Sequence, residues 1–129
     1  MKEALFNAAM VGLGGFLGAL ARFTVSGVIQ KSFLKGVFPL GTLSVNMIGC
    51  VLVGLLLGVS DARDIFTIQV RLFLVVGVLG GFTTFSTFGY ETFMMISEGD
   101  YLKATVNVMA HIIFGVALVW VGYFVTTLK

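Results

Sequence analysis

Long uncharged stretches alternate with short polar ones along this chain of 129 residues. A helix needs about 20 mostly apolar residues to cross a bilayer, and four stretches are close to that length. The expected spans are residues 4–30, 40–60, 71–97 and 104–128. The pattern therefore predicts an all-α membrane protein. It has one domain, residues 1–129, with four transmembrane helices and both termini on the same side.

The composition agrees with a chain that lies in a lipid bilayer. Hydrophobic residues make up 58% of it and charged residues 11%, whereas a soluble domain is usually about 25% charged. This excludes most soluble enzymes and any disordered protein. The net charge of +2 is small and the basic residues are scattered, so nucleic acid is not an expected partner. One histidine and one cysteine give no support for a metal-ligand set or Cys/His catalysis, and no enzymatic activity is expected.

The first stretch has a second interpretation. Residues 19–21, Ala-Leu-Ala, resemble the cleavage site of a secretory signal peptide, and Lys2 begins the chain. However, Glu3 offsets the charge of Lys2, and Gly14 and Gly18 suit a packed helix better than a segment that is removed. We therefore expect this stretch to be a membrane span.

The basic residues predict no orientation in the membrane. The side with the termini carries Lys2, Arg63, Arg71 and Lys129, and the other side carries Arg22, Lys31, Lys35 and Lys103. Orientation follows the bias of Lys and Arg between the two sides, and four against four gives none. Such a chain can insert both ways, and opposite copies can pair about a two-fold axis in the membrane plane. The alternative is that other features set one orientation.

Small residues are spaced for close helix contacts. Three G-x-x-x-G pairs occur, at 14–18, 54–58 and 77–81. Small residues let helix backbones approach closely in lipid. Some of these pairs serve contacts within the chain, but three pairs in four helices favour a tight assembly over a lone monomer.

The third expected span contains a segment that is poorly suited to a continuous helix. Residues 80–88 read GGFTTFSTF. Glycine costs about 1 kcal/mol relative to alanine in a helix, and Thr and Ser hydroxyls compete for backbone groups. We expect the helix to break here, near mid-membrane, where freed backbone groups must be buried in protein or line a wet site. The alternative is an unbroken helix with a Ser/Thr-rich packing face.

Three phenylalanines in this segment, Phe82, Phe85 and Phe88, are spaced i, i+3 and so lie near one another on a helix face. Such a stripe is often a core or lipid contact. The functional interpretation rests on ring electrostatics, because the edge of a phenyl ring is positive and can touch an anion.

Polar side chains in the other spans have both structural and functional interpretations. Asn46 either forms an interhelical hydrogen bond or donates to a passing anion. Arg22 either snorkels or makes a structural contact, or it attracts anions into a vestibule. Glu91 suits a hydrogen bond to a neighbouring segment or a proton relay. His111 and Asn107 share a helix face, which either packs or lines a pathway.

Together these residues resemble the Fluc (CrcB) family of bacterial fluoride channels. The resemblance rests on residues 80–88, on GTLSVN at 41–46 and on GALAR at 18–22, and it covers essentially the whole chain. It implies an antiparallel, dual-topology homodimer with two fluoride pores. It also implies passive export of fluoride across the bacterial cytoplasmic (inner) membrane, which protects the cell from fluoride. A structural sodium ion is implied at the dimer centre.

The resemblance also assigns residues. Phe85 and Phe88 match the paired pore phenylalanines, and Asn46 matches the pore asparagine. Gly80 and Thr83 match the positions whose backbone carbonyls hold sodium.

Further positions match the family pattern, and the fourth span departs from it. Ser86 and Thr87 match a hydroxyl track beside the pore. Thr42, Arg22 and Glu91 match further positions of the pattern. In the fourth span, some members have serine or threonine where this chain has Gly115 and Val119. There Asn107 and His111 would supply the polarity instead.

Two other functions fit a chain of this kind. A small multidrug or cation exporter also has four helices, but it places an acidic side chain at the centre of its binding chamber. Here Glu91 is the only acid within a span, and it lies beyond the centre of that span. A structural membrane subunit without a pathway is the second alternative.

Overall fold

The computed structural model describes residues 1–33, 38–63 and 66–128. This part of the chain is helical and contains no strand. The elements are α1 (Lys2–Phe33), α2 (Leu40–Arg63), α3 (Ile68–Arg71), the π-helix η1 (Leu72–Leu79), α4 (Gly80–Phe82), α5 (Phe85–Ser97) and α6 (Tyr101–Thr127).

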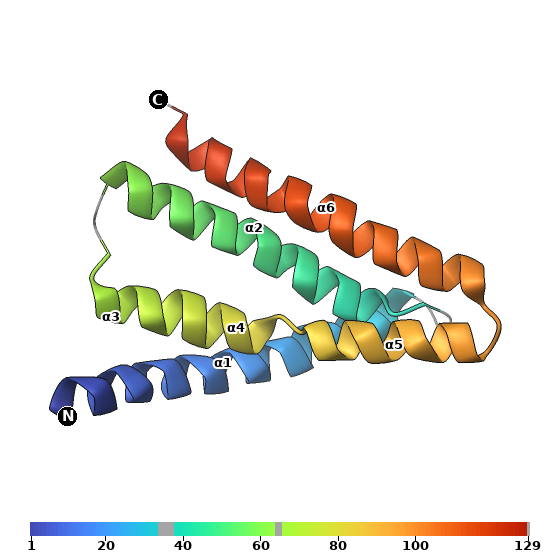
Figure 1. Cartoon of the computed structure of the whole chain (residues 1–129), viewed down its shortest axis with the longest axis horizontal. Coiled ribbons are helices and arrows are strands. Elements are labelled where there is room, and N and C mark those ends of the chain that lie inside the picture. Colours follow the sequence, from blue (N-terminus) through green and yellow to red (C-terminus); the bar gives the residue numbers. More distant parts are fainter. Residues whose placement is uncertain (34–37, 64–65, 129) are drawn as a thin grey trace.

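Four segments are long and apolar enough to cross a membrane. They are α1, α2, α6 and the run from α3 to α5, which we call the third segment (Ile68–Ser97). The chain therefore has the build of a multi-pass membrane protein, as the sequence predicts. The segments alternate in direction, so the N-terminus, the end of α2, the start of α3 and the end of α6 lie at the same end of the molecule (Figure 1).

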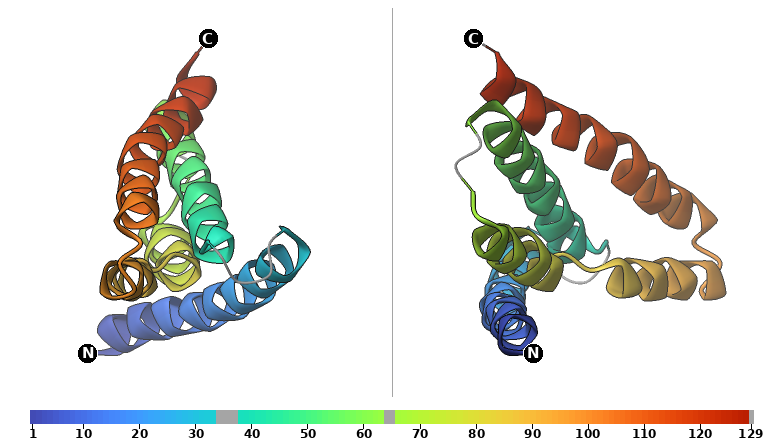
Figure 2. Two further views of the ribbon diagram at one scale, coloured as in Figure 1. Left: turned by 90° about the vertical axis from the view of Figure 1, so that its right-hand side faces the viewer. Right: turned by 60° about the vertical axis from the view of Figure 1, so that its left-hand side comes forward.

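Each segment packs against particular neighbouring segments. α1 lies against η1, α4 and α2, and α2 lies against α6. In Figure 2, α1 and α6 lie on opposite sides of the molecule. The helices extend slightly beyond most of the expected spans, and the last expected span ends one residue after α6. Lys35 and Lys129, which enter the charge balance, lie outside the described residues.

All three glycine pairs make contacts within the chain. Residues 14–18 of α1 pack against 77–81 of η1 and α4, and residues 54–58 of α2 pack against α6. A Cβ at Gly18 would overlap the carbonyl oxygen of Val78. The prediction that these pairs favour an oligomer therefore loses its basis, because contacts inside one chain already use them.

Two local features shape the third segment and its exit. The π-helix η1 was not predicted, since its sequence, LFLVVGVL, is uniformly apolar and contains no breaker. After α5, Gly99 has a φ of 79°, a left-handed conformation that favours glycine. The N–H of Asp100 donates to the Met95 carbonyl (2.8 Å) and that of Gly99 to the Ile96 carbonyl (3.1 Å). These two bonds form a Schellman motif, which turns the chain toward α6.

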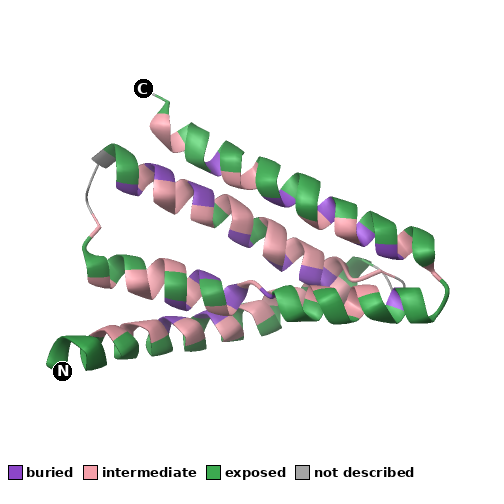
Figure 3. Cartoon of the chain, viewed as in Figure 1, coloured by how far each residue is buried: buried purple, intermediate pink, exposed green. Residues whose placement is uncertain are grey.

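Large apolar side chains cover the outside of the molecule. Buried residues lie on the inner faces of the helices, and many of the remaining residues are exposed (Figure 3). Phe16, Phe23 and Trp120 are among the exposed side chains. So much exposed apolar surface suits contact with lipid or with another membrane-embedded chain.

Candidate functional site: the interruption of the third segment

The helix of the third segment stops at Phe82 and resumes at Phe85. Thr83 has φ −86° and ψ 159°, and Thr84 has φ −150° and ψ 116°, so both residues are extended. Two extended residues between helices leave backbone groups without their usual helical partners. Other side chains supply partners for several of these groups.

Asn46 of α2 pairs with the backbone of Thr84. The Thr84 N–H donates to Asn46 Oδ1 (2.9 Å), and Asn46 Nδ2 donates to the Thr84 carbonyl (3.1 Å). One amide side chain thereby satisfies both backbone groups of an extended residue. Of the two interpretations of Asn46, the structure contains the interhelical hydrogen bond. An amide nitrogen carries two hydrogens, so this bond leaves a second donor on Nδ2.

The Thr84 side chain caps the N-terminus of α5. Its Oγ1 accepts from the N–H of Thr87 (3.2 Å), as an N-cap residue does. The hydroxyls of Thr87 and Ser86 lie 2.9 Å and 3.3 Å from the same oxygen. The two hydroxyls that the family pattern places along a track therefore gather at Thr84, which is buried, while Ser86 and Thr87 are themselves exposed in this single chain.

Arg22 of α1 also binds the interruption. Its Nη1 donates to the Thr83 carbonyl (3.1 Å). The side chain is part-buried, and Arg22 lies well inside α1, which continues to Phe33. The structural contact considered for Arg22 is therefore present, and Arg22 does not lie at a helix end, because α1 continues to Phe33.

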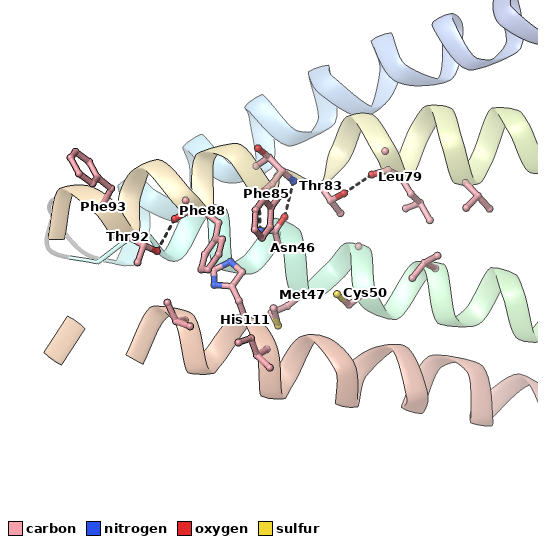
Figure 4. A pocket seen from close by; sticks show the side chains of 18 of the residues that line it. Asn46, Met47, Cys50, Leu79, Thr83, Phe85, Phe88, Thr92, Phe93 and His111 are labelled. Carbon is pink, nitrogen blue, oxygen red and sulfur yellow. Dashed lines mark hydrogen bonds between the residues drawn. The ribbon is translucent and has the colours of Figure 1, made fainter. Parts of the chain in front are cut away.

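A cavity of about 860 Å³ lies beside the interruption, between α2, the third segment and α6 (Figure 4). Most of its lining is apolar, with a few hydroxyl, amide and imidazole groups. Half of the residues singled out from the sequence line it, namely Asn46, Gly80, Thr83, Phe85, Phe88 and His111. The other half do not, namely Arg22, Thr42, Ser86, Thr87, Glu91 and Asn107.

The three phenylalanines do not form one stripe. Phe85 and Phe88 are neighbours, with ring centroids 5.5 Å apart, and both line the cavity. Phe82 precedes the interruption and is buried, outside the cavity lining. Residues spaced i, i+3 share a face only in a continuous helix, so the two extended residues separate Phe82 from the other two rings. Phe85 is 82% exposed in the single chain.

A chain of hydrogen bonds connects α5 and α6 behind Phe88. Thr92 Oγ1 donates to the Phe88 carbonyl (2.7 Å) and accepts from Asn107 Nδ2 (2.9 Å). The backbone carbonyl of Asn107 lies 2.9 Å from Nδ1 of His111, whose ring lies against that of Phe88 with centroids 4.3 Å apart. Asn107 is completely buried. His111 and Asn107 are therefore in contact through this hydrogen bond, but only His111 lines the cavity.

Glu91 of α5 binds α2. The Thr42 hydroxyl donates to Glu91 Oε1 (2.7 Å), and Thr42 is buried. Glu91 Oε2 is buried without a hydrogen-bond partner among the described residues. The hydrogen bond considered for Glu91 is therefore present. The Glu91 carboxylate binds α2, and Glu91 does not line the cavity.

Two residues at the site were missing from the sequence-based selection. Thr84 is the partner of Asn46, and Thr92 is the partner of Asn107. Buried amides need hydrogen-bond partners, so each asparagine signals a polar partner on another helix. The sequence does not say which of several nearby threonines that partner is.

This chain is similar to one family of known proteins over most of its length. A family model described as "CrcB-like protein, Camphor Resistance (CrcB)" matches residues 9–123. The "Fluoride-specific ion channel FluC 3" of Methanosarcina barkeri is 40% identical over 118 residues, 92% of this chain and 88% of that protein. The "Fluoride-specific ion channel FluC" of Methylobacillus flagellatus is 39% identical over 119 residues, 92% of this chain and 93% of that protein. A protein of the same name from Pyrococcus abyssi is 43% identical over 111 residues, covering 86% and 88%.

Proposed function

This chain belongs to the CrcB family, and from that premise we propose that it is a fluoride-selective channel. The family is one of ion channels and not of enzymes. In this proposal, fluoride leaves the cytoplasm passively, down its electrochemical gradient, across the cytoplasmic membrane. Its export protects the cell from fluoride toxicity.

The observation that carries the proposal is the cavity beside the interrupted helix. Fluoride is small and strongly hydrated, so a pore must replace part of its water shell and still release it. Ring edges of Phe85 and Phe88 offer weak positive contacts, and the second N–H of Asn46 offers a donor. No Asp, Glu, Lys or Arg is among the residues that line the cavity in the described part of the chain. The lining therefore provides weak contacts for an anion without a permanent charge that would trap it.

We propose that two copies in opposite orientation form the channel, with two pores. Phe85 is largely exposed and Gly80 is exposed in the single chain, although both line the cavity. A second copy lying against this face would shield the open cavity from lipid, which cannot satisfy polar backbone groups. The near balance of basic residues between the two sides supports insertion in both directions.

The proposal includes a structural sodium ion held by the carbonyls of Gly80 and Thr83. These carbonyls fit such a role. The helical partner of the Gly80 carbonyl would be the N–H of Thr84, which donates to Asn46 instead. The Thr83 carbonyl accepts one bond, from Arg22, and a carbonyl oxygen has two lone pairs. When bound, the ion supplies a fixed positive charge that attracts anions.

The carrier alternative is less well supported. A cation exporter needs an acidic side chain in its chamber, and the candidate, Glu91, is hydrogen-bonded to Thr42 and does not line the cavity. We therefore expect Glu91→Gln to leave fluoride release measurable, whereas a carrier that depends on this carboxylate would lose its transport.

Fluoride release from liposomes tests the proposed function. Vesicles containing the purified protein are loaded with potassium fluoride, and valinomycin is added so that potassium can follow. A fluoride electrode should record rapid release, while vesicles loaded with potassium chloride should lose little chloride. Fluoride release no faster than from protein-free vesicles would overturn the proposal.

A further inference from the structure

Gly49 of α2 is a buried glycine that lies against the interruption of the third segment. It follows Asn46 by three residues, so both lie on the same face of α2. A Cβ added at Gly49 would overlap the Cγ2 methyl of Thr83 and would lie 3.7 Å from Cδ1 of Phe82. Phe82 is the last residue of α4, and Thr83 is the first extended residue. Gly49 therefore makes room for the residues at which the helix stops.

Three glycines line the cavity in the described part of the chain, and Gly49 is the one that is closely packed. For Gly89, no described atom outside its chain neighbours and its own helix backbone lies within 4 Å of an added Cβ. For Gly80, the nearest such atom is the Val75 carbonyl oxygen, at 3.9 Å. A methyl group at either of these positions would have space, whereas one at Gly49 would displace Thr83.

The Thr83 side chain is held in one orientation by a hydrogen bond. Its Oγ1 donates to the Leu79 carbonyl (2.9 Å; Figure 4), which also accepts from the Thr83 N–H (3.0 Å). The methyl and the hydroxyl of threonine are attached to the same carbon, so a bond that fixes Oγ1 also fixes Cγ2. Turning the methyl away from Gly49 would break the side-chain bond to Leu79. An added methyl at Gly49 would therefore push the Thr83 main chain and α2 apart.

Other hydrogen bonds keep the interruption close to α2. Asn46 of α2 binds both the N–H and the carbonyl of Thr84. Arg22 of α1 donates to the Thr83 carbonyl (3.1 Å). Because Gly49 and Asn46 lie on one helix face, a wider spacing at Gly49 would strain the bonds of Asn46 or shift the Thr83 carbonyl. The absence of a side chain at Gly49 thus allows all of these hydrogen bonds to form together.

We propose, on the basis of the proposed function, that Gly49 is a positioning residue of the fluoride pathway. Its missing side chain sets the position of the Thr83 carbonyl, which we assign, with that of Gly80, to the sodium ion. Binding groups have to lie within about 0.5 Å of their productive positions. A methyl at Gly49 would require the Thr83 methyl to move by more than about 1 Å to reach van der Waals separation. Gly49 acts through Thr83 and touches neither ion.

The first experiment separates this contact from general packing by means of a second substitution. Thr83→Ser retains the hydroxyl and removes the Cγ2 methyl, so it provides space for a methyl at Gly49. Fluoride release from liposomes should be at least about tenfold slower after Gly49→Ala in the wild-type background. In a Thr83→Ser background, the same change should slow release by less than about twofold, because residues in contact have non-additive effects. In a Thr83→Val background, which retains a branched side chain, Gly49→Ala should again cause the full loss.

Gly89→Ala and Gly122→Ala are matched controls, because each adds the same single methyl. The first adds it to the cavity lining without an overlap and should keep most of the fluoride release. The second places it against the Val51 carbonyl, where α2 packs against α6, away from the interruption. Gly122→Ala should lower stability, and Thr83→Ser should not relieve its effect.

The second experiment measures unfolding and does not depend on fluoride transport. The thermal unfolding midpoint in detergent is compared in sodium chloride and in choline chloride. The wild type should unfold at a higher temperature in sodium, because a ligand that binds the folded state stabilises it. Gly49→Ala should lose this sodium increment, and Gly49→Ala combined with Thr83→Ser should regain it. Gly122→Ala should keep the increment despite a lower midpoint in both salts.

Unchanged fluoride release or an unchanged sodium increment in Gly49→Ala would overturn the inference while the proposed channel function stands. Equal losses with and without Thr83→Ser, or an equal relief by Thr83→Val, would also overturn it. If Gly49→Ala does not fold, the double variant with Thr83→Ser should fold and show the sodium increment, and its failure in either respect would contradict the inference.

The wild type distinguishes the remaining cases. A wild-type midpoint that does not depend on sodium would overturn both the inference and the proposed sodium ion. A wild-type protein that releases no fluoride would instead overturn the proposed function.

Discussion

At the scale of single residues, Asn46 connects α2 to the interruption of the third segment. Its amide binds both the N–H and the carbonyl of Thr84, so an extended residue is satisfied without a strand partner. The sequence suggests that Asn46 is important, because a buried amide needs partners. It does not reveal that the partner is a backbone, since the backbone of Thr84 is free only after the helix has been interrupted.

Asn46→Asp tests both roles of this residue. The aspartate can still accept from the Thr84 N–H, but it faces the Thr84 carbonyl without a donor and adds a negative charge to the cavity. Repulsion of roughly 3 kcal/mol at about 5 Å predicts a loss of fluoride flux of about a hundredfold. Efflux from liposomes measures it, and a wild-type trace from this variant would contradict the assignment of Asn46 to the pathway.

The rings of Phe85 and Phe88 lead to a second prediction. Replacing Phe85 by isoleucine retains apolar bulk but removes the positive ring edge. We expect at least about a tenfold slower fluoride efflux with an intact assembly, as judged by size-exclusion chromatography, and the same result for Phe88→Ile.

Phe93→Ile is the matched control. Phe93 is also exposed on α5 and lines the same cavity, two turns after Phe85. We expect this variant to keep most of the flux. Equal losses in all three variants would show that apolar packing, and not ring edges at two positions, explains the effect.

At the scale of elements, the sequence predicts the four segments well because apolar length is a strong local signal. It also indicates where the third segment is poorly helical, and residues 83–84 are extended in the structure. It does not predict the π-helix η1 or the separation of Phe82 from Phe85, because both depend on how the third segment packs against α1 and α2. Hydrogen-bond partners such as Thr92 are likewise determined by tertiary contacts.

Close packing between α1 and the third segment leads to a stability prediction. Gly18→Ala places a methyl group against the Val78 carbonyl, and the required backbone shift should cost about 1–3 kcal/mol. Gly12→Ala is the control, because no described atom outside its chain neighbours and its own helix backbone lies within 4 Å of its added Cβ. Thermal unfolding in detergent should show a lower midpoint for Gly18→Ala and an unchanged or slightly higher one for Gly12→Ala. Equal midpoints for the two variants would contradict the packing account.

At the scale of the whole molecule, charge balance and shape bear on the assembly. Arg22 binds the Thr83 carbonyl inside the helix packing, so it does not count as a connecting-loop charge. Without it, the balance becomes four basic residues on the side of the termini against three on the other. This is a difference of one residue and still a weak bias. The glycine pairs serve contacts within the chain, so the support for a dimer comes from the open cavity and the exposed Phe85.

Insertion in both orientations can be measured in cell membranes. An N-terminal epitope tag should be accessible to a protease from each side of the membrane in about half of the copies, because the bias of basic residues is small. Right-side-out and inside-out vesicles give the two fractions. Protection from one side in nearly all copies would contradict the antiparallel dimer.

Selective conduction of fluoride by this chain has a direct signature in the reversal potential of the current. The protein is placed in a planar bilayer with fluoride on one side and chloride on the other, and then with a fluoride gradient in constant chloride. The current should have a reversal potential that follows the fluoride gradient and is insensitive to chloride. A reversal potential that follows chloride, or the absence of any current above that of the bare bilayer, would contradict selective fluoride conduction.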